Sequence, residues 1–236
     1  MLLFCGLIIF FASITQTLSG FGFGLVSMAL LPTIMPIDNA VPLVSMMGIL
    51  VEVVLIFRFR HALTLRRVLR LTLASVVGIP IGIFMLNHVD LKLLVRLLGI
   101  FVGLYALYGL FNFPIPHLEN RRWAYPFGFV GGFLSGLYNI PGPSFVIYGT
   151  TQGWTPDQFR GNLQGLFLVN SIISVVGHSL NGAYTAQVGE WVPTMLAGSV
   201  AGIFCGLIAN RLISPQQFRK LVLIVLLVLS VRLVMG

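Results

Sequence analysis

Long apolar runs separated by short polar loops make up most of this chain. Six of these runs are long enough to cross a lipid bilayer, which takes about 20 apolar residues in an α-helix. They are residues 39–57, 69–86, 91–111, 159–180, 191–210 and 218–235. The pattern predicts an all-α polytopic membrane protein in which a single transmembrane domain takes up residues 1–236.

Two further apolar segments, residues 2–35 and 123–152, are interrupted by glycine and proline. In the first, the arm that follows the glycines would rise only about 18 Å, against a hydrocarbon core of about 30 Å. Each segment is therefore predicted to be a hairpin of two partial helices, broken at 20–24 and at 139–143. A continuous, kinked crossing is the alternative. Unwound backbone at membrane depth persists only where it lines a cavity, so the two breaks predict a binding site.

The charge balance supports the same topology. Charged residues make up only 8% of the chain and hydrophobic residues 57%, and the net charge is +8. Five arginines fall in residues 58–70, which the positive-inside rule places in the cytoplasm. If 123–152 is a hairpin, the loop 181–190, which lacks lysine and arginine, lies outside. The positive charge thus indicates membrane orientation rather than nucleic-acid binding.

The two halves of the chain resemble each other. The sequence Leu-Ser-Gly at 18–20 recurs at 134–136, and Gly78 and Gly82 correspond to Gly202 and Gly206. These matches predict two repeats, 1–113 and 121–236, each a broken-helix hairpin followed by three transmembrane helices. Under the charge assignment the repeats have opposite orientations, which is the inverted-topology plan of many secondary transporters.

The breaks have the chemistry of an anion site. A helix that begins at membrane depth presents unpaired N–H groups and the positive end of its dipole. Glycine permits the tight turns, and proline fixes φ where a helix restarts. The alternative is that the glycines only allow close helix packing, as expected at Gly128, Gly132 and Gly136. The candidate substrate-binding residues are Ser19, Gly20, Phe21, Gly22, Phe23, Gly24, Tyr138, Asn139, Pro141, Gly142, Pro143, Ser144, Arg160, Asn162 and Gln164.

A polar stripe follows the second hairpin. It consists of residues at helical spacings of 4, 3, 4, 3 and 4, namely Arg160, Gln164, Phe167, Ser171, Ser174 and His178. Two interpretations remain open, a wall of the binding site and a seam of hydrogen bonds between helices. His178 is expected at the outer water interface.

Glu52 is the only carboxylate deep within a predicted crossing. An apolar environment favours the neutral form of a carboxyl group, so Glu52 is a candidate carrier of a coupling proton. The alternative is an ion pair with Arg58 or Arg60. Asp38 and Asp157 stand at the beginnings of helices and are expected to be N-caps.

Enzymatic and metal chemistry find no support in the sequence. No zinc-protease, phosphate-loop or nucleophile-elbow motif occurs, so we expect neither an enzyme nor a chain that hydrolyses ATP. Cys5 and Cys205 both lie inside apolar runs and are expected to be packing residues. No cofactor and no metal site are predicted.

The chain resembles the TauE/SafE sulfite exporter family. The resemblance rests on GFGFGLVSMALLP at 20–32 and on GLYNIPGPSFVIYGTTQGWTPDQFRGNLQGLF at 136–167, which includes the pair Phe159 and Arg160. It implies a multi-pass protein of the inner (plasma) membrane that moves sulfite, organosulfonates or related small anions. This chain has Gly161 and Asn162 where many members have a small residue and threonine, and phenylalanines in its first break where others have more glycine.

Together these observations predict a secondary transporter that exports a small sulfur-containing anion by alternating access around a midplane site. A passive anion channel, an importer of another small organic anion and a membrane scaffold remain alternatives. The expected partners are the anion, membrane lipids and a coupling proton, and a homo-oligomer is compatible with the sequence.

Overall fold

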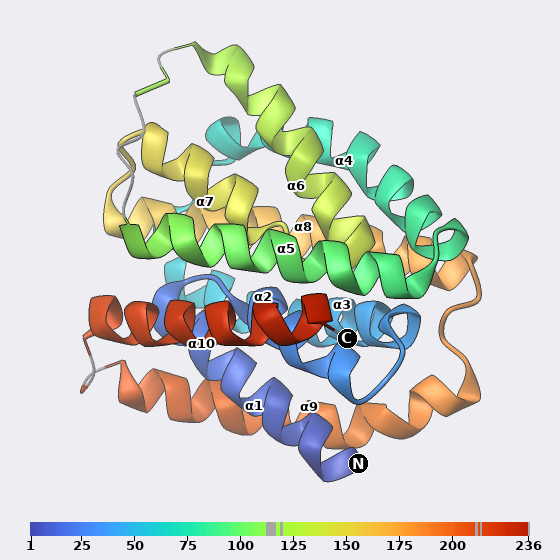
Figure 1. Cartoon of the computed structure of the whole chain (residues 1–236). Coiled ribbons are helices and arrows are strands. Elements are labelled where there is room, and N and C mark those ends of the chain that lie inside the picture. The colour runs from blue at the N-terminus through green and yellow to red at the C-terminus, as the bar shows by residue number, and fades with distance from the viewer. Residues whose placement is uncertain (112–116, 119, 211, 213, 236) are drawn as a thin grey trace.

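The computed structural model describes residues 1–111, 117–118, 120–210, 212 and 214–235, and its elements are all helical (Figure 1). Three short 3₁₀ turns supplement the α-helices, η1 (Leu31–Thr33), η2 (Arg60–Ala62) and η3 (Arg121–Trp123). The α-helices are α1 (Leu2–Ser19), α2 (Phe23–Leu30), α3 (Ile37–Phe59), α4 (Leu65–His88), α5 (Leu91–Phe111), α6 (Ala124–Tyr138), α7 (Gly142–Thr151), α8 (Pro156–Leu180), α9 (Ala186–Ala209) and α10 (Pro215–Met235).

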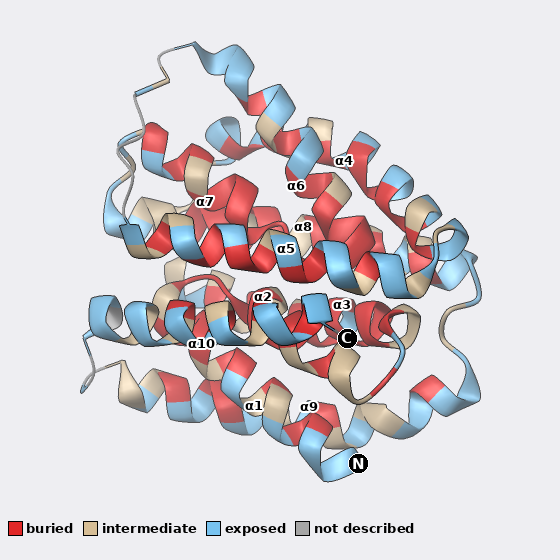
Figure 2. Cartoon of the chain, viewed as in Figure 1, coloured by how far each residue is buried: buried red, intermediate tan, exposed pale blue. Residues whose placement is uncertain are grey.

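The helices have the lengths and surfaces of a polytopic membrane protein. Within the described residues, six segments are long and apolar enough to cross a bilayer, the helical segments containing α1, α3, α4, α5, α8 and α9. The remaining predicted crossing, 218–235, forms the 21-residue helix α10, which carries Arg219, Lys220 and Arg232. Many large apolar side chains are exposed on the outside, including Phe84 and Phe204, as a lipid-facing surface requires. In Figure 2 exposed residues run along α4, α9 and α10, while buried residues concentrate around α7 and α8.

Both predicted helix breaks form. The chain leaves α1 at Gly20 (φ 82°) and enters α2 after Gly22 (φ 108°), left-handed conformations that glycine adopts without penalty. At the second break Asn139 (φ 52°) ends α6, and Pro143 falls in the first turn of α7, where its missing N–H costs nothing. The arms of the first hairpin are unequal, because α1 has 18 residues and is long enough to cross, whereas α2 has only eight.

Each hairpin packs closely against a helix of the other half of the chain. Helix α1 lies along α9 and α6 lies along α4, while α3 packs on α8 and α5 on α10 (Figure 1). Glycines allow the approach: a Cβ at Gly132 would stand 2.2 Å from the Ser75 carbonyl oxygen, and one at Gly202 would stand 2.4 Å from that of Phe10. The packing role expected for Gly128, Gly132 and Gly136 is confirmed, and Gly202 has the same role.

The prediction that aspartates cap two helices is wrong. Thr155 caps α8, because its side-chain oxygen accepts a hydrogen bond from the backbone N–H of Gln158. Pro156 takes the first helical position, a place that suits proline, so Asp157 falls one residue further inside. In α3 the N-cap is Pro36, and Asp38 is again the second helical residue. Both aspartates remain in the first turn, where negative charge is favourable.

Candidate functional site

The two helix breaks meet inside the molecule. A Cβ added to Gly24, in the first turn of α2, would stand 2.1 Å from the carbonyl oxygen of Asn139, so the two backbones are in contact. A small cavity of about 20 Å³ lies beside this contact, with room for about one water molecule. Its lining comes from both breaks and from α1, α3 and α8, and consists of Gln16, Gly22, Phe23, Gly24, Leu25, Glu52, Asn139, Ile140, Pro141, Gly142 and Phe167.

Unpaired backbone N–H groups stand at this cavity. In α2 the first amide, Phe23 N, donates to Gln16 Oε1 at 3.0 Å, whereas the N–H groups of Gly24 and Leu25 have no partner in the described structure. In α7 the N–H group of Gly142, which lines the cavity, is likewise unpaired in the described structure, as is that of Ser144 in the same first turn. Both helices therefore start at the cavity with free donors and the positive end of their dipoles.

Two glutamine side chains hold the first break to α8. Gln16 Nε2 donates to Gln164 Oε1 at 3.2 Å, and Gln164 Nε2 donates to the Gly20 carbonyl oxygen at 2.7 Å. Gln164 was predicted at the site, but Gln16 was missed. The available signal was a long amide side chain in an apolar run, seven residues before the second helix begins, since such groups are placed toward protein or water within a membrane.

Glu52 lines the cavity from α3. It is 6% exposed, and its Oε1 accepts a hydrogen bond from Ser171 Oγ at 3.0 Å. Its other oxygen, Oε2, is buried without a partner in the described part of the chain, so the alternative ion pair with Arg58 or Arg60 does not form there. A hydrogen-bonding position of this carboxyl group is therefore available at the cavity.

Arg160 and Asn162 lie near the first break but do not line the cavity. Arg160 Nη2 donates to the Leu18 carbonyl oxygen at 3.5 Å, and its guanidinium stands over the Phe59 ring, 5.6 Å from the centroid. The arginine thus stands at the C-terminal end of α1, where the dipole favours a cation. Asn162 Oδ1 accepts from the Thr64 backbone N–H at 2.8 Å and ties α8 to the start of α4.

Several other predicted side chains make bonds within the fold. Ser19 Oγ donates to the Thr15 carbonyl and also contacts that of Phe21. Tyr138 donates to the Leu94 carbonyl at 2.9 Å, and Ser144 Oγ to that of Phe127 at 2.6 Å. The Phe21 ring lies beside the Arg219 guanidinium of α10 rather than at the cavity. Gly20 and Pro143 shape the two turns without lining it.

The polar stripe of α8 connects helices along its length. Gln164 bonds α1, Ser171 bonds Glu52 of α3, and Ser174 Oγ lies 3.3 Å from Ser135 Oγ of α6. From Gln164 to Ser174 the stripe is therefore a seam of hydrogen bonds between helices. Through Ser171 it also holds Glu52, which lines the cavity, so both interpretations apply to this part of α8. The expectation for His178 is wrong, because this side chain is only 1% exposed. Helix α4 packs along this part of α8 and removes it from solvent.

Interrupted helices that meet at an internal site in an all-helical membrane protein are typical of membrane transport proteins. The family comparison agrees. Residues 5–233 match the family model described as sulfite exporter TauE/SafE, and the chain belongs to this family. No curated protein and no solved structure gives a significant match. In the described residues no group of three or more His, Cys, Asp or Glu side chains is placed to hold a metal ion.

Proposed function

We propose that this protein is a secondary transporter that exports a small sulfur-containing anion, sulfite or an organosulfonate, across the inner membrane. The anion binds between the two breaks, where the N–H groups of Gly24, Leu25 and Gly142 donate to its oxygens. The observation that carries the proposal is the meeting of two helix N-termini, both with unpaired donors, at one buried cavity. Family membership supplies the substrate class.

The size of the cavity favours a carrier over an open channel. A space of about 20 Å³ holds about one water molecule, whereas sulfite has four non-hydrogen atoms. The breaks must separate to admit the anion and close again around it. A pore that stays open needs no such movement, so the small volume between the breaks supports alternating access rather than a passive filter.

The packing pattern supports two related repeats. The hairpin α1–α2 corresponds to α6–α7, and helix α4 corresponds to α9. When the two halves are exchanged, the pair α1 and α9 therefore becomes the pair α6 and α4, and both pairs pack closely. The pairs α3 with α8 and α5 with α10 map onto themselves. We propose that repeats 1–113 and 121–236 have inverted topology and that rocking of one against the other opens the cavity to each side in turn.

Glu52 gives the site a role for protons. A charged carboxylate repels an anion in the same cavity, so anion binding favours the protonated carboxyl group. With its free Oε2 at the cavity, protonated Glu52 becomes a further hydrogen-bond donor to the anion. The inside-negative membrane potential favours outward movement of an anion by about 2.3 kcal/mol per charge per 100 mV.

The test is counterflow in proteoliposomes. Vesicles loaded with excess unlabelled sulfite are placed in a trace of labelled sulfite, and a carrier accumulates the label above its equilibrium level. A channel lets the label equilibrate without an overshoot, and a scaffold gives no flux, so either result overturns the proposal. An importer is recognised in cells by accumulation of the anion rather than its extrusion.

A further inference from the structure

A second, larger recess lies at the end of the molecule that carries the loop between α3 and α4. It has a volume of about 530 Å³ and is formed where the start of α4, η3 and the end of α7 come together. We call it the arginine pocket, lined by Thr64, Arg66, Arg67, Arg70, Arg121, Tyr148, Gln152 and Trp154. An adjoining hollow of about 520 Å³ shares Arg70 and Arg121 and adds Asn120, Arg122 and Tyr125.

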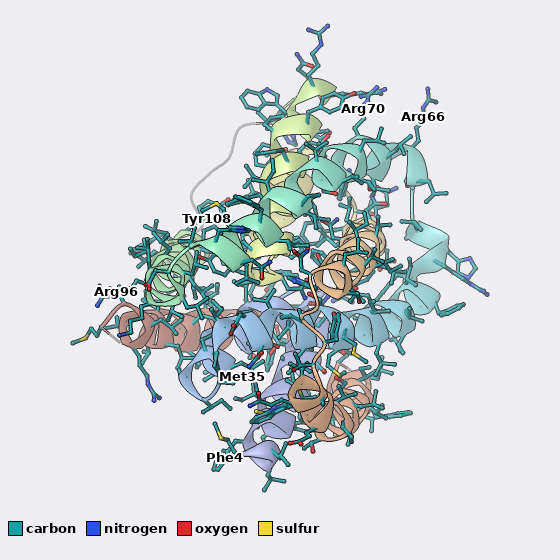
Figure 3. The ribbon with its side chains drawn as sticks, turned by 90° about the vertical axis from the view of Figure 1, so that its right-hand side faces the viewer. Phe4, Met35, Arg66, Arg70, Arg96 and Tyr108 are labelled. Carbon is teal, nitrogen blue, oxygen red and sulfur yellow. The ribbon has the colours of Figure 1, made fainter. Side chains whose placement is uncertain are left out.

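Among the described residues, no acidic side chain lines the arginine pocket or the adjoining hollow. The segments that line the pocket and the hollow, 64–70, 120–125 and 148–154, contain five arginines and no acidic residue. The only hydrogen bond of an arginine side chain lining the pocket runs from Arg67 Nη1 to the neutral amide of Gln158, at 2.9 Å, in the described structure. Figure 3 shows Arg66 and Arg70 at the same end of the molecule, with their side chains extending from α4. Like charges gathered in one recess attract a multiply charged anion.

The positive-inside rule explains why basic residues face the cytoplasm, but it does not require them to converge on a recess. Aromatic side chains surround the recess as well. Tyr148 and Trp154 line it, with ring centroids 6.1 Å apart, and nearby Trp123 and Tyr125 are about half exposed. Tryptophan and tyrosine favour the headgroup level of a bilayer, so the recess lies where lipid phosphates are found.

We propose that the arginine pocket is a binding site for phosphate groups, occupied by the headgroup of an anionic phospholipid or by a soluble phosphate. The planar guanidinium pairs with phosphate through two parallel hydrogen bonds, and basic recesses between helices on the cytoplasmic side suit such headgroups. The site is separate from the transport cavity, although α7 links the two, since Gly142 lines the cavity and Gln152, the residue after α7, lines the pocket.

The test measures binding directly, so it does not depend on any transport activity. In one arm the purified full chain is titrated with pyrophosphate, and thermal unfolding is followed in neutral detergent. In the other arm the chain, with Trp123 and Trp191 replaced by phenylalanine, is reconstituted in phosphatidylcholine nanodiscs with brominated phosphatidylglycerol, and quenching of the fluorescence of Trp154 reports adjacent lipid. Brominated phosphatidylcholine provides the reference for non-specific contact.

Substitution of the arginines should weaken binding in proportion to charge. A basic residue near anionic phosphates contributes about fivefold in affinity, so R70Q/R121Q should bind on the order of 25-fold more weakly than the parent. The matched control is R60Q, because Arg60 is exposed in the loop between α3 and α4 but does not line the pocket. R70K/R121K keeps the positive charge and should retain most of the binding. This variant tests the role of charge even if R70Q/R121Q folds poorly.

The two arms identify the source of the phosphate. If pyrophosphate binds in detergent but phosphatidylglycerol does not quench, the natural ligand of the pocket is a soluble phosphate. If only phosphatidylglycerol quenches, the ligand is a lipid headgroup. Each result supports the proposal. Three results overturn it: binding in neither arm, an equal loss in R60Q, or tighter binding of sulfite than of pyrophosphate. The last result would make the recess a vestibule for the transported anion.

Discussion

Replacement of Gly24 by alanine tests the anion site most directly, because this residue holds the two breaks in contact. The added Cβ would stand 2.1 Å from the Asn139 carbonyl oxygen, whereas ordinary van der Waals contact of a Cβ lies at 3.4–4 Å. One break must therefore move by more than about 1 Å. Gly24 has helical backbone geometry, so alanine introduces no φ strain and even improves helix propensity by about 0.5–1 kcal/mol.

The expected result is a large loss of transport with a smaller loss of stability. Overpacking costs about 1–3 kcal/mol, and the gain in propensity offsets part of it. A displacement of about 1 Å in a site that positions its ligand costs on the order of 100-fold in rate. We therefore expect G24A to remain folded and to reduce counterflow of sulfite between about 10-fold and 100-fold.

The assay is counterflow by G24A beside G189A in matched proteoliposomes. Gly189 is exposed in α9 and a Cβ there meets no atom within 4 Å, so its variant controls for a generic glycine-to-alanine change. Size-exclusion profiles and thermal unfolding establish that both variants are folded. If G24A is folded and transports at the parental rate, the contact between the breaks does not position the anion, and the reasoning fails.

Three further predictions follow from buried contacts. E52Q places a permanently neutral side chain at the cavity, so the rate at which this variant transports a sulfonate should stay constant between about pH 6 and 8. The rate of the parent protein should fall as pH rises over the same range. If E52Q shows the pH profile of the parent, Glu52 does not have the proposed role. Q164L removes the bonds to the Gly20 carbonyl and to Gln16 and should lower stability by about 1–3 kcal/mol, read from thermal unfolding with Q187L, at an exposed position of α9, as control. In G136A the Cβ would stand 2.1 Å from the Ile79 carbonyl oxygen, so the pair α4 and α6 should be destabilised by a similar amount; an unchanged melting temperature would show that these helices separate freely.

The secondary structure followed from the sequence because the membrane imposes simple constraints. The length of each apolar run predicted the crossing helices, and the GFGFG and NIPGP sequences predicted the positions of both breaks within a residue or two. The helix starts were less predictable. Asp157 and Thr155 are both good capping residues, and Pro156 between them decided which one caps.

The candidate site was harder to predict, because its assembly depends on contacts between distant segments. Gln16 gains its role from Gln164, which is 148 positions away, and no local pattern expresses that pairing. Arg160 has the charge expected of an anion ligand, yet its neighbours are the Leu18 carbonyl and the Phe59 ring. Residue chemistry identified which groups could bind, whereas only the packing of α8 determined which of them reach the cavity.

The pairing of α1 with α9 has a consequence for biosynthesis. Gly6 packs against Gly198, which leaves the ribosome roughly 190 residues later, on the order of 10–40 s at ordinary rates of translation. During that interval the nascent hairpin carries the amide of Gln16 in the lipid without its eventual partner on α8. The first segments therefore complete their contacts only after the last third of the polypeptide has been synthesised.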